Sequence, residues 1–205
     1  SDGKEIWKQV VFAKPAGPIH AKNSHASPTP VIADGRLYLH FGHEGTAALD
    51  AAEGKLLWTQ TSLSYPPAHG NGGSPVLHGN GLIFACDGVK DPFVAALDKD
   101  NGKILWKTAR AVEVKSKFSF STPLLIEING ATQAVIPGSG AVVAYNPRDG
   151  KEIWRFRYGE GYSVVPRPLY HEGIIYVCSG FGRAVLFAVK ADGKGDITDT
   201  HLVWK

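Results

Sequence analysis

The sequence predicts an all-β fold built from about four repeats of a four-stranded antiparallel unit. The first observation is tryptophan spacing: all five tryptophans of the 205-residue chain recur at intervals of about 50 residues. The second is a repeated turn before the tryptophan, written ALDAAEGKLLW at 48–58, ALDKDNGKILW at 96–106 and AYNPRDGKEIW at 144–154. The third is that no stretch of ten or more residues shows a helical period of hydrophobicity.

Each repeat reads as two hairpins in succession. A proline followed by Val or Leu opens the first strand, at Pro30, Pro75, Pro123 and Pro168. A turn dipeptide ends that strand: Asp34-Gly35, Asn80-Gly81, Asn129-Gly130 and Glu172-Gly173, of which the first three favour a type I′ turn. Apolar runs such as GRLYLHFG, GLIFACDG and GIIYVCSG supply the second strand. The third strand ends in the ALD-type tail, and the fourth carries the tryptophan.

A period of this length with four strands per unit is typical of a β-propeller blade. We therefore expect residues 1–205 to form one β-propeller segment, with repeats at about 8–58, 59–106, 107–154 and 155–205. The last tail, AVKADGKGDITDTHLVW, is longer than the others. The chain opens on one tryptophan-bearing outer strand, DGKEIWK, and closes on another, so a closed four-bladed ring would leave one of them unpaired.

The repeated turn has a physical interpretation. Asp50 and Asp98 are placed to accept hydrogen bonds from backbone N–H groups of the turn, and glycine permits the backbone angle it needs. We expect each indole to lie flat between one blade and the next, which contributes at most roughly 4–6 kcal/mol per ring from ~150–250 Å² buried. The docking residues are Trp58, Trp106 and Trp154, with Gly54, Gly102 and Gly150.

The pattern A-x-D-x-x-x-G-K-x-x-W resembles the tryptophan-docking motif of the pyrroloquinoline quinone (PQQ)-like β-propeller superfamily. That superfamily includes the quinoprotein alcohol dehydrogenases and the BamB-like lipoprotein of bacterial outer-membrane assembly. The resemblance covers essentially the whole chain. It implies a ring of about eight blades around an axial channel and an exported protein of the periplasm or cell envelope. The remaining blades would come from a longer chain of roughly twice this length or from a second copy.

The resemblance leaves two functions open. The dehydrogenases carry two adjacent cysteines over the cofactor, whereas Cys86 and Cys178 stand in equivalent places of the second and fourth repeats, too far apart for a disulfide. The sequence also shows no recognisable Ca²⁺ motif beside a catalytic carboxylate. We expect a non-catalytic binding or scaffold module without a cofactor; the alternative is a PQQ-dependent quinoprotein oxidoreductase that acts on an alcohol or sugar and holds PQQ with Ca²⁺.

A ligand site is expected just before each repeated proline, because the first strand of a blade in this family lies nearest the axis. Convergent polar groups in a concavity are the usual ligand site. The alternative is that these side chains face solvent at the ends of loops. The candidates that would line such a funnel are His25, His69, Asn71, Lys117, Ser119, Tyr162 and Arg167.

Two further clusters were considered as metal sites. His40 and His43 lie three residues apart but lack a partner cysteine or a His-Glu-x-x-His helix, so loop or core histidines are the alternative. Asp192, Asp196 and Asp199 offer oxygen ligands, but their spacing does not match a Ca²⁺-binding loop and favours a structured hairpin turn.

Composition limits the partners. The formal charge is +3, and no segment approaches the ~18 apolar residues of a membrane helix, so no membrane span is expected. The basic run at 103–118 holds five Lys or Arg and one Glu, which is either a solvated face or an anion or nucleic-acid contact. We expect a protein or carbohydrate partner held by loops or funnel, and no nucleic acid.

Overall fold

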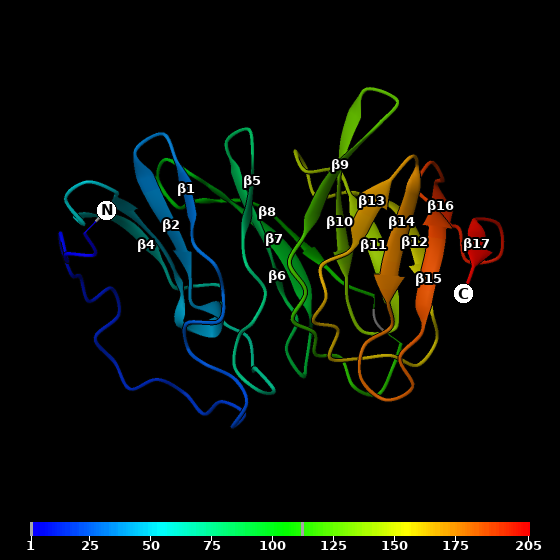
Figure 1. The fold of residues 1–205 in the computed structure, drawn as a ribbon, viewed down its shortest axis with the longest axis horizontal. Coiled ribbons are helices and arrows are strands. Elements are labelled where there is room, and N and C mark those ends of the chain that lie inside the picture. Colours follow the sequence, from blue (N-terminus) through cyan, green and yellow to red (C-terminus); the bar gives the residue numbers. More distant parts are fainter. Residues whose placement is uncertain (1, 112) are drawn as a thin grey trace.

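The computed structural model describes residues 2–111 and 113–205 and contains four antiparallel sheets, which we call blades 1 to 4. The blades follow one another along the chain, and the two termini lie at opposite ends of the molecule (Figure 1). The predicted all-β class and the four-stranded antiparallel units are thereby confirmed. No helix in the described residues is long and apolar enough to cross a membrane.

Each blade is built on a meander of four antiparallel strands that follow one another in chain order. Blade 1 contains β1 (Val31–Ala33), β2 (Arg36–His40), β3 (Thr46–Asp50) and β4 (Leu56–Gln60). Blade 2 contains β5 (Val76–His78), β6 (Gly81–Cys86), β7 (Phe93–Asp98) and β8 (Ile104–Ala109). Blade 3 contains β9 (Leu124–Ile128), β10 (Ala131–Pro137), β11 (Ala141–Tyr145) and β12 (Glu152–Arg157). Blade 4 contains β13 (Leu169–His171), β14 (Ile174–Cys178), β15 (Leu186–Lys190) and β17 (Leu202–Trp204).

The extra length of the tail in blade 4 forms an additional strand. Its two-residue strand β16 (Gly195–Asp196) pairs in parallel with β12, so blade 3 gains a fifth strand from its neighbour. The carboxylate of Asp196 accepts hydrogen bonds from Thr198 and from Arg157 Nε at 2.8 Å. These bonds lower the pKa of Asp196 to about 2, with Thr198 the larger cause. The tail is therefore an ordered segment that connects blade 4 to blade 3.

The tight turns follow the sequence signals with one correction. Asp34-Gly35, Asn129-Gly130 and Glu172-Gly173 all take positive φ at both residues, as a type I′ turn requires. In blade 2 the turn lies one residue earlier than predicted, at Gly79-Asn80, with φ of +56° at Gly79. A glycine at the first turn position favours type II′ instead, because only that residue then needs positive φ.

The aspartate of the repeated turn accepts hydrogen bonds from backbone N–H groups, as expected. Asp50 Oδ1 accepts hydrogen bonds from the N–H groups of Ala52 and Glu53, and Asp98 Oδ1 accepts those of Asp100 and Asn101. Gly54, Gly102 and Gly150 have φ between +69° and +73°. The aspartate therefore holds the turn closed while the glycine supplies its left-handed backbone.

The same glycines receive indole rings from the preceding unit. A Cβ on Gly102 would lie 2.6 Å from Trp58 Cε3, and Gly54 and Gly150 face Trp7 and Trp106 in the same way. Each indole Nε1 donates to a carbonyl of the same turn; for example, Trp58 Nε1 lies 3.0 Å from Lys99 O. The glycine is thus required twice, for its backbone angle and for the space beside its Cα.

Trp154 is held differently, because the tail of blade 4 replaces the short turn. It is fully buried, and its Nε1 donates to Gln133 Oε1 at 2.8 Å. Its backbone pairs with that of Gly195 in β16. Trp58 and Trp106 are also buried, whereas Trp204 at the outer edge of blade 4 is 46% exposed.

The hydrophobic core is divided into three clusters, one between each pair of adjacent blades. Side chains alternate along β6 to serve two of them: Leu82 and Phe84 face blade 1, whereas Ile83 faces blade 3. Blades 2 and 3 are therefore covered on both faces, and part of their stability comes from contacts with their neighbours.

Two expectations about local structure were wrong. A three-residue 3₁₀ helix, η1 (Gly42–Glu44), interrupts the predicted helix-free chain between β2 and β3. The outer strand predicted at DGKEIWK, residues 2–8, does not form, because the described residues before β1 include no strand with which it could pair. Trp7 nevertheless keeps the contacts with the turn of blade 1, through Ala51 O and Gly54.

Candidate functional site

The stretches before the four repeated prolines, which we call the inner segments, lie side by side. Thr29 N donates to Ser74 Oγ at 2.8 Å, and Ser74 N donates to Thr122 Oγ1 at 3.0 Å. In blade 4 the hydroxyl residue is replaced by Arg167, whose Nε donates to Pro123 O at 3.1 Å. A ladder of hydrogen bonds therefore joins the inner segment of each blade to that of the next.

Aromatic side chains of these segments and of the loop after β14 form a continuous series, which we call the aromatic row: His20, His69, Phe118, Tyr162 and Phe181. Successive ring centroids lie 5.1, 5.1, 5.4 and 5.8 Å apart, and each pair meets edge to face. Such edge-to-face contacts are favourable for aromatic rings. The row crosses all four blades.

Every ring of the row retains exposed surface. His20 and Phe181, at its two ends, are exposed, and the three rings between them are half-buried. The backbone fixes their positions: His20 N donates to His69 O, and Phe181 N donates to Tyr162 O at 2.8 Å. The rings are therefore both accessible and held in place.

Two of the predicted site residues, His69 and Tyr162, belong to this row. Lys117 and Ser119 flank Phe118 in the chain, with Lys117 half-buried. Ser119 is buried, and its hydroxyl bonds both the N–H and the C=O of Val164 at 3.1 Å. Ser119 thus joins blade 3 to blade 4 and does not face a ligand.

The other predicted residues lie apart from the row or at its margin. Asn71 Oδ1 accepts a hydrogen bond from Tyr65 OH at 3.2 Å, and its Nδ2 is buried without a partner. His25 is exposed and lines a cavity of about 300 Å³ beside Trp7, between the N-terminal stretch and blade 1. Arg167 is exposed next to the backbone of blade 3.

Sequence reasoning missed His20, Phe118 and Phe181. The repeat carried a signal for two of them, because His20, His69 and Phe118 follow one another at about one repeat length. Phe181 comes from the loop after β14 and not from the stretch before a proline, so the alignment on proline had no means to find it.

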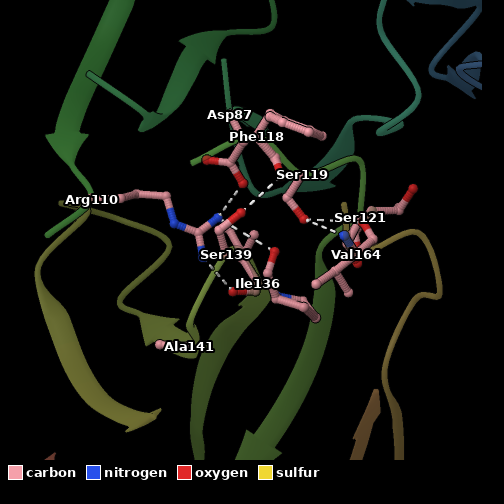
Figure 2. A network of polar contacts seen from close by, with 12 residues as sticks. Asp87, Arg110, Phe118, Ser119, Ser121, Ile136, Ser139, Ala141 and Val164 are labelled. Carbon is pink, nitrogen blue, oxygen red and sulfur yellow. Dashed lines mark hydrogen bonds and ion pairs between the residues drawn. The ribbon is translucent and has the colours of Figure 1, made fainter. Parts of the chain in front are cut away.

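A buried ion pair lies near Phe118 of the row, at the junction of blades 2 and 3 (Figure 2). Arg110 Nη1 lies 2.7 Å from Asp87 Oδ2, and both side chains are 2% exposed. Arg110 also donates through Nη2 to Ile136 O at 2.8 Å. Burial raises the pKa of Asp87 to about 6, and the adjacent guanidinium opposes part of that rise.

This ion pair is connected to the backbone of the aromatic row. Ser119 N donates to Asp87 O at 3.3 Å, and Ser139 Oγ donates to Phe118 O at 2.8 Å. Figure 2 shows the Arg110 guanidinium and the Ser119 hydroxyl on either side of this connection. The pair therefore anchors the inner segment that presents Phe118.

The histidine and aspartate clusters do not form a metal site in the part of the chain that the structure describes. His40 Nδ1 lies 2.9 Å from Thr46 Oγ1, and its ring stacks on Phe84 at 4.1 Å. His43 Nε2 lies 2.9 Å from Glu44 Oε1. Both histidines have structural partners. Cys86 and Cys178 are free thiols, and burial raises the pKa of Cys86 well above its usual value.

Acidification is expected to destabilise the fold through His40. Burial lowers the pKa of this ring from 6.5 to about 3, so the unfolded chain binds a proton that the folded chain excludes. Between pH 7 and pH 5 the free energy of unfolding should fall by about 2 kcal/mol from this group. The contribution of Asp87 to the free energy of unfolding has the opposite pH dependence. Because the pKa of Asp87 is raised in the folded protein, this contribution falls as the pH rises from about 4 to about 6.

A comparison of variants isolates the histidine. Urea denaturation of the parent and of His40→Gln at pH 7 and pH 5 should show a smaller loss on acidification in the variant. His171→Gln, which alters an exposed histidine, is the matched control and should behave as the parent does. Equal losses in parent and His40→Gln would contradict the assignment.

Comparison with known proteins decides the family. A sequence model described as outer membrane protein assembly factor BamB matches residues 1–109. The chain belongs to the PQQ-like β-propeller superfamily. Among curated relatives, quinoprotein alcohol dehydrogenase PedH of Pseudomonas putida is 30% identical over 142 residues, 65% of this chain and 23% of the enzyme. Quinoprotein ethanol dehydrogenase of Pseudomonas aeruginosa is 29% identical over 146 residues, 64% of this chain and 23% of the enzyme.

Solved structures show the same fold. BamB from Moraxella catarrhalis matches with a TM-score of 0.59 and 17% identity, over 83% of this chain and 54% of that one. Quinohemoprotein alcohol dehydrogenase from Comamonas testosteroni matches with a TM-score of 0.61 and 15% identity, over 80% of this chain and 33% of that one. The chain spans about a quarter of the length of the curated superfamily members it matches.

The described residues do not supply a donor set for the PQQ–Ca²⁺ centre that the superfamily implies. Ca²⁺ prefers six to eight oxygen ligands, and no cluster of three acidic, histidine or cysteine side chains occurs among these residues. Near the aromatic row the buried carboxylate is that of Asp87, and Arg110 already occupies one of its oxygens.

Proposed function

We propose that this PQQ-like propeller segment is a non-catalytic binding or scaffold module of the bacterial cell envelope. The observation that carries the proposal is the aromatic row, in which rigid, partly exposed rings from successive blades form one surface. Aromatic side chains with few rotatable bonds suit binding, because little conformational entropy is lost when a partner stacks on them. The family match to BamB supports an envelope location and a periplasmic, exported protein.

The recurrent tryptophans serve this module as docking residues. They connect each blade to the next through an indole, a glycine and a backbone carbonyl. A scaffold needs this rigidity, because its rings must keep their relative positions in the absence of a partner. The partner, a protein or a carbohydrate, would contact the inner segments and the loops around them.

A quinoprotein oxidoreductase is the second candidate, favoured by the sequence similarity to quinoprotein alcohol dehydrogenases. In that case the full protein would oxidise an alcohol or sugar with PQQ and Ca²⁺. The ion-paired state of Asp87 argues against it, because a carboxylate bound to a buried guanidinium is poorly placed to act as a base or to coordinate a cation.

The two candidates predict different results with PQQ. We expect no saturable binding of PQQ to the purified chain at micromolar concentration in the presence of Ca²⁺, measured by absorbance titration. We also expect no dye-linked dehydrogenase activity with ethanol or glucose. A quinoprotein alcohol dehydrogenase assayed beside it is the control. A one-to-one isotherm with PQQ would replace the binding-module proposal by the oxidoreductase.

A further inference from the structure

We propose that the aromatic row binds an acidic oligosaccharide, a chain of sugars that carry carboxylates. The inference rests on the proposed function as a binding module and names the class of its ligand. Sugar rings present apolar C–H faces that stack on aromatic rings, and their hydroxyl and carboxylate groups bind polar side chains at the margin. The row and its surroundings supply both kinds of group.

The geometry of the row suits a chain of rings. Its five aromatic side chains come from five separate stretches of the backbone, at nearly constant centroid spacing of 5.1 to 5.8 Å. That spacing is comparable to the length of one sugar unit in an oligosaccharide. Because the repeat sets the position of each ring, the row presents a regular series of contacts to a ligand that is itself regular.

The exposure of the row shows that it is a surface and not an extension of the core. Phe181 is 70% exposed, although a large apolar ring is normally buried. His20 at the other end is also exposed, and Phe120 lies 6.0 Å from Phe118 beside the row. An aromatic surface that is exposed at both ends and half-buried between them is typical of a binding site.

Charge selects an acidic sugar over a neutral one. The inner segments and the loop around Phe181 contain more basic than acidic residues. The basic residues are Lys22, Lys115, Lys117, Arg167 and Arg183, and the acidic ones are Glu113 and Glu160. Glu113 is itself 3.4 Å from Arg157, which offsets its charge. These stretches of the chain therefore carry a net positive charge, which complements a polymer with regularly spaced carboxylates.

Binding is tested by calorimetry with a galacturonic acid hexamer as the probe and maltohexaose as its neutral counterpart. We expect the acidic hexamer to bind at least tenfold more tightly than maltohexaose, and its affinity to fall as salt is raised. Absence of binding, equal affinity for the two hexamers, or tighter binding of a single-stranded deoxythymidine oligomer would overturn the proposal.

Variants locate the site. Phe181→Ala and Tyr162→Ala should each weaken binding of the acidic hexamer by about tenfold, because each removes a stacking ring. Lys22→Gln, next to His20 of the row with its backbone N 3.1 Å from His20 Nδ1, should weaken binding and reduce its salt dependence. The matched controls are Val165→Ala, an exposed apolar side chain of the same inner segment, and Lys151→Gln, an exposed lysine of the blade 3 turn.

Folding and function are separated by two further readouts. Circular dichroism melting of each variant shows whether the fold is retained; Phe181 is exposed enough that its loss should leave the melting temperature unchanged. Unchanged affinity in a folded Phe181→Ala and Tyr162→Ala protein would overturn the site. PQQ binding or dehydrogenase activity would refute the proposed function instead, and that result is measured independently of the hexamer.

Discussion

Replacement of Arg110 by methionine is expected to lower the free energy of unfolding by about 3–5 kcal/mol at pH 7. The guanidinium is 2% exposed and lies 2.7 Å from Asp87 Oδ2. Its removal leaves a buried carboxylate without its counter-charge and removes the hydrogen bond to the Ile136 carbonyl. At pH 5 the loss should be smaller, because Asp87 then takes up a proton and becomes neutral.

The complementary substitution gives a different pH response. Asp87→Leu leaves a guanidinium that stays charged at any accessible pH. It also removes the carboxyl group whose raised pKa adds stability as the pH falls below about 6, so its cost relative to the parent should be larger at pH 5 than at pH 7. The double variant Asp87→Leu with Arg110→Met replaces both charges by apolar groups. It should be close to the parent in stability, because desolvation of two charges offsets most of their attraction.

Urea denaturation of the parent, both single variants and the double variant makes up a double-mutant cycle, which measures the coupling between Asp87 and Arg110. The control is Lys151→Met, which removes one partner of the exposed Lys151–Asp149 pair and should leave the denaturation midpoint unchanged. Single variants as stable as the parent, or a double variant that loses the sum of the two single effects, would contradict a coupled buried pair.

The fold was predictable because its determinants are repeated. A large buried ring and a glycine with positive φ each tolerate few substitutes, so they mark the same place in every unit. The structure differs from the prediction where the repeat is irregular. The tail of blade 4 is visibly longer in the sequence, but its strand β16 pairs with β12 of another blade. A local pattern carries no information about that partner.

The site was predicted only in part, for reasons of register and of sequence separation. Lys117 and Ser119 were chosen on either side of Phe118, yet successive residues of an extended segment point to opposite faces, so both choices missed the ring between them. Asp87 and Arg110 each occur in one repeat only. Their pairing depends on the packing of blade 2 against blade 3, and no periodic signal announces it.

The contact between Trp106 and Gly150 gives the second prediction with a large effect. Trp106→Ala should lower the free energy of unfolding by about 3–5 kcal/mol, because it removes a buried ring and leaves a cavity between blades 2 and 3. The substitution also removes the hydrogen bond that Trp106 Nε1 donates to Pro147 O at 3.0 Å. A denaturation midpoint equal to that of the parent would remove the docking role assigned to the ring.

Gly150→Ala tests the same contact from the other side. Gly150 has φ of +70°, and a Cβ there would overlap the six-membered ring of Trp106. Gly130 has a similar φ of +76°, but a Cβ there would meet open space, so Gly130→Ala measures the backbone cost alone, about 1–2 kcal/mol. In the parent, Gly150→Ala should cost more than Gly130→Ala. In the Trp106→Ala background the difference between the two costs should shrink, because the ring is gone and of the nearest atoms only Thr108 Oγ1, 2.7 Å from the new Cβ, remains. If Gly150→Ala costs no more than Gly130→Ala in the parent protein, the glycine serves the turn alone and the repeated Gly–Trp spacing has a purely local origin.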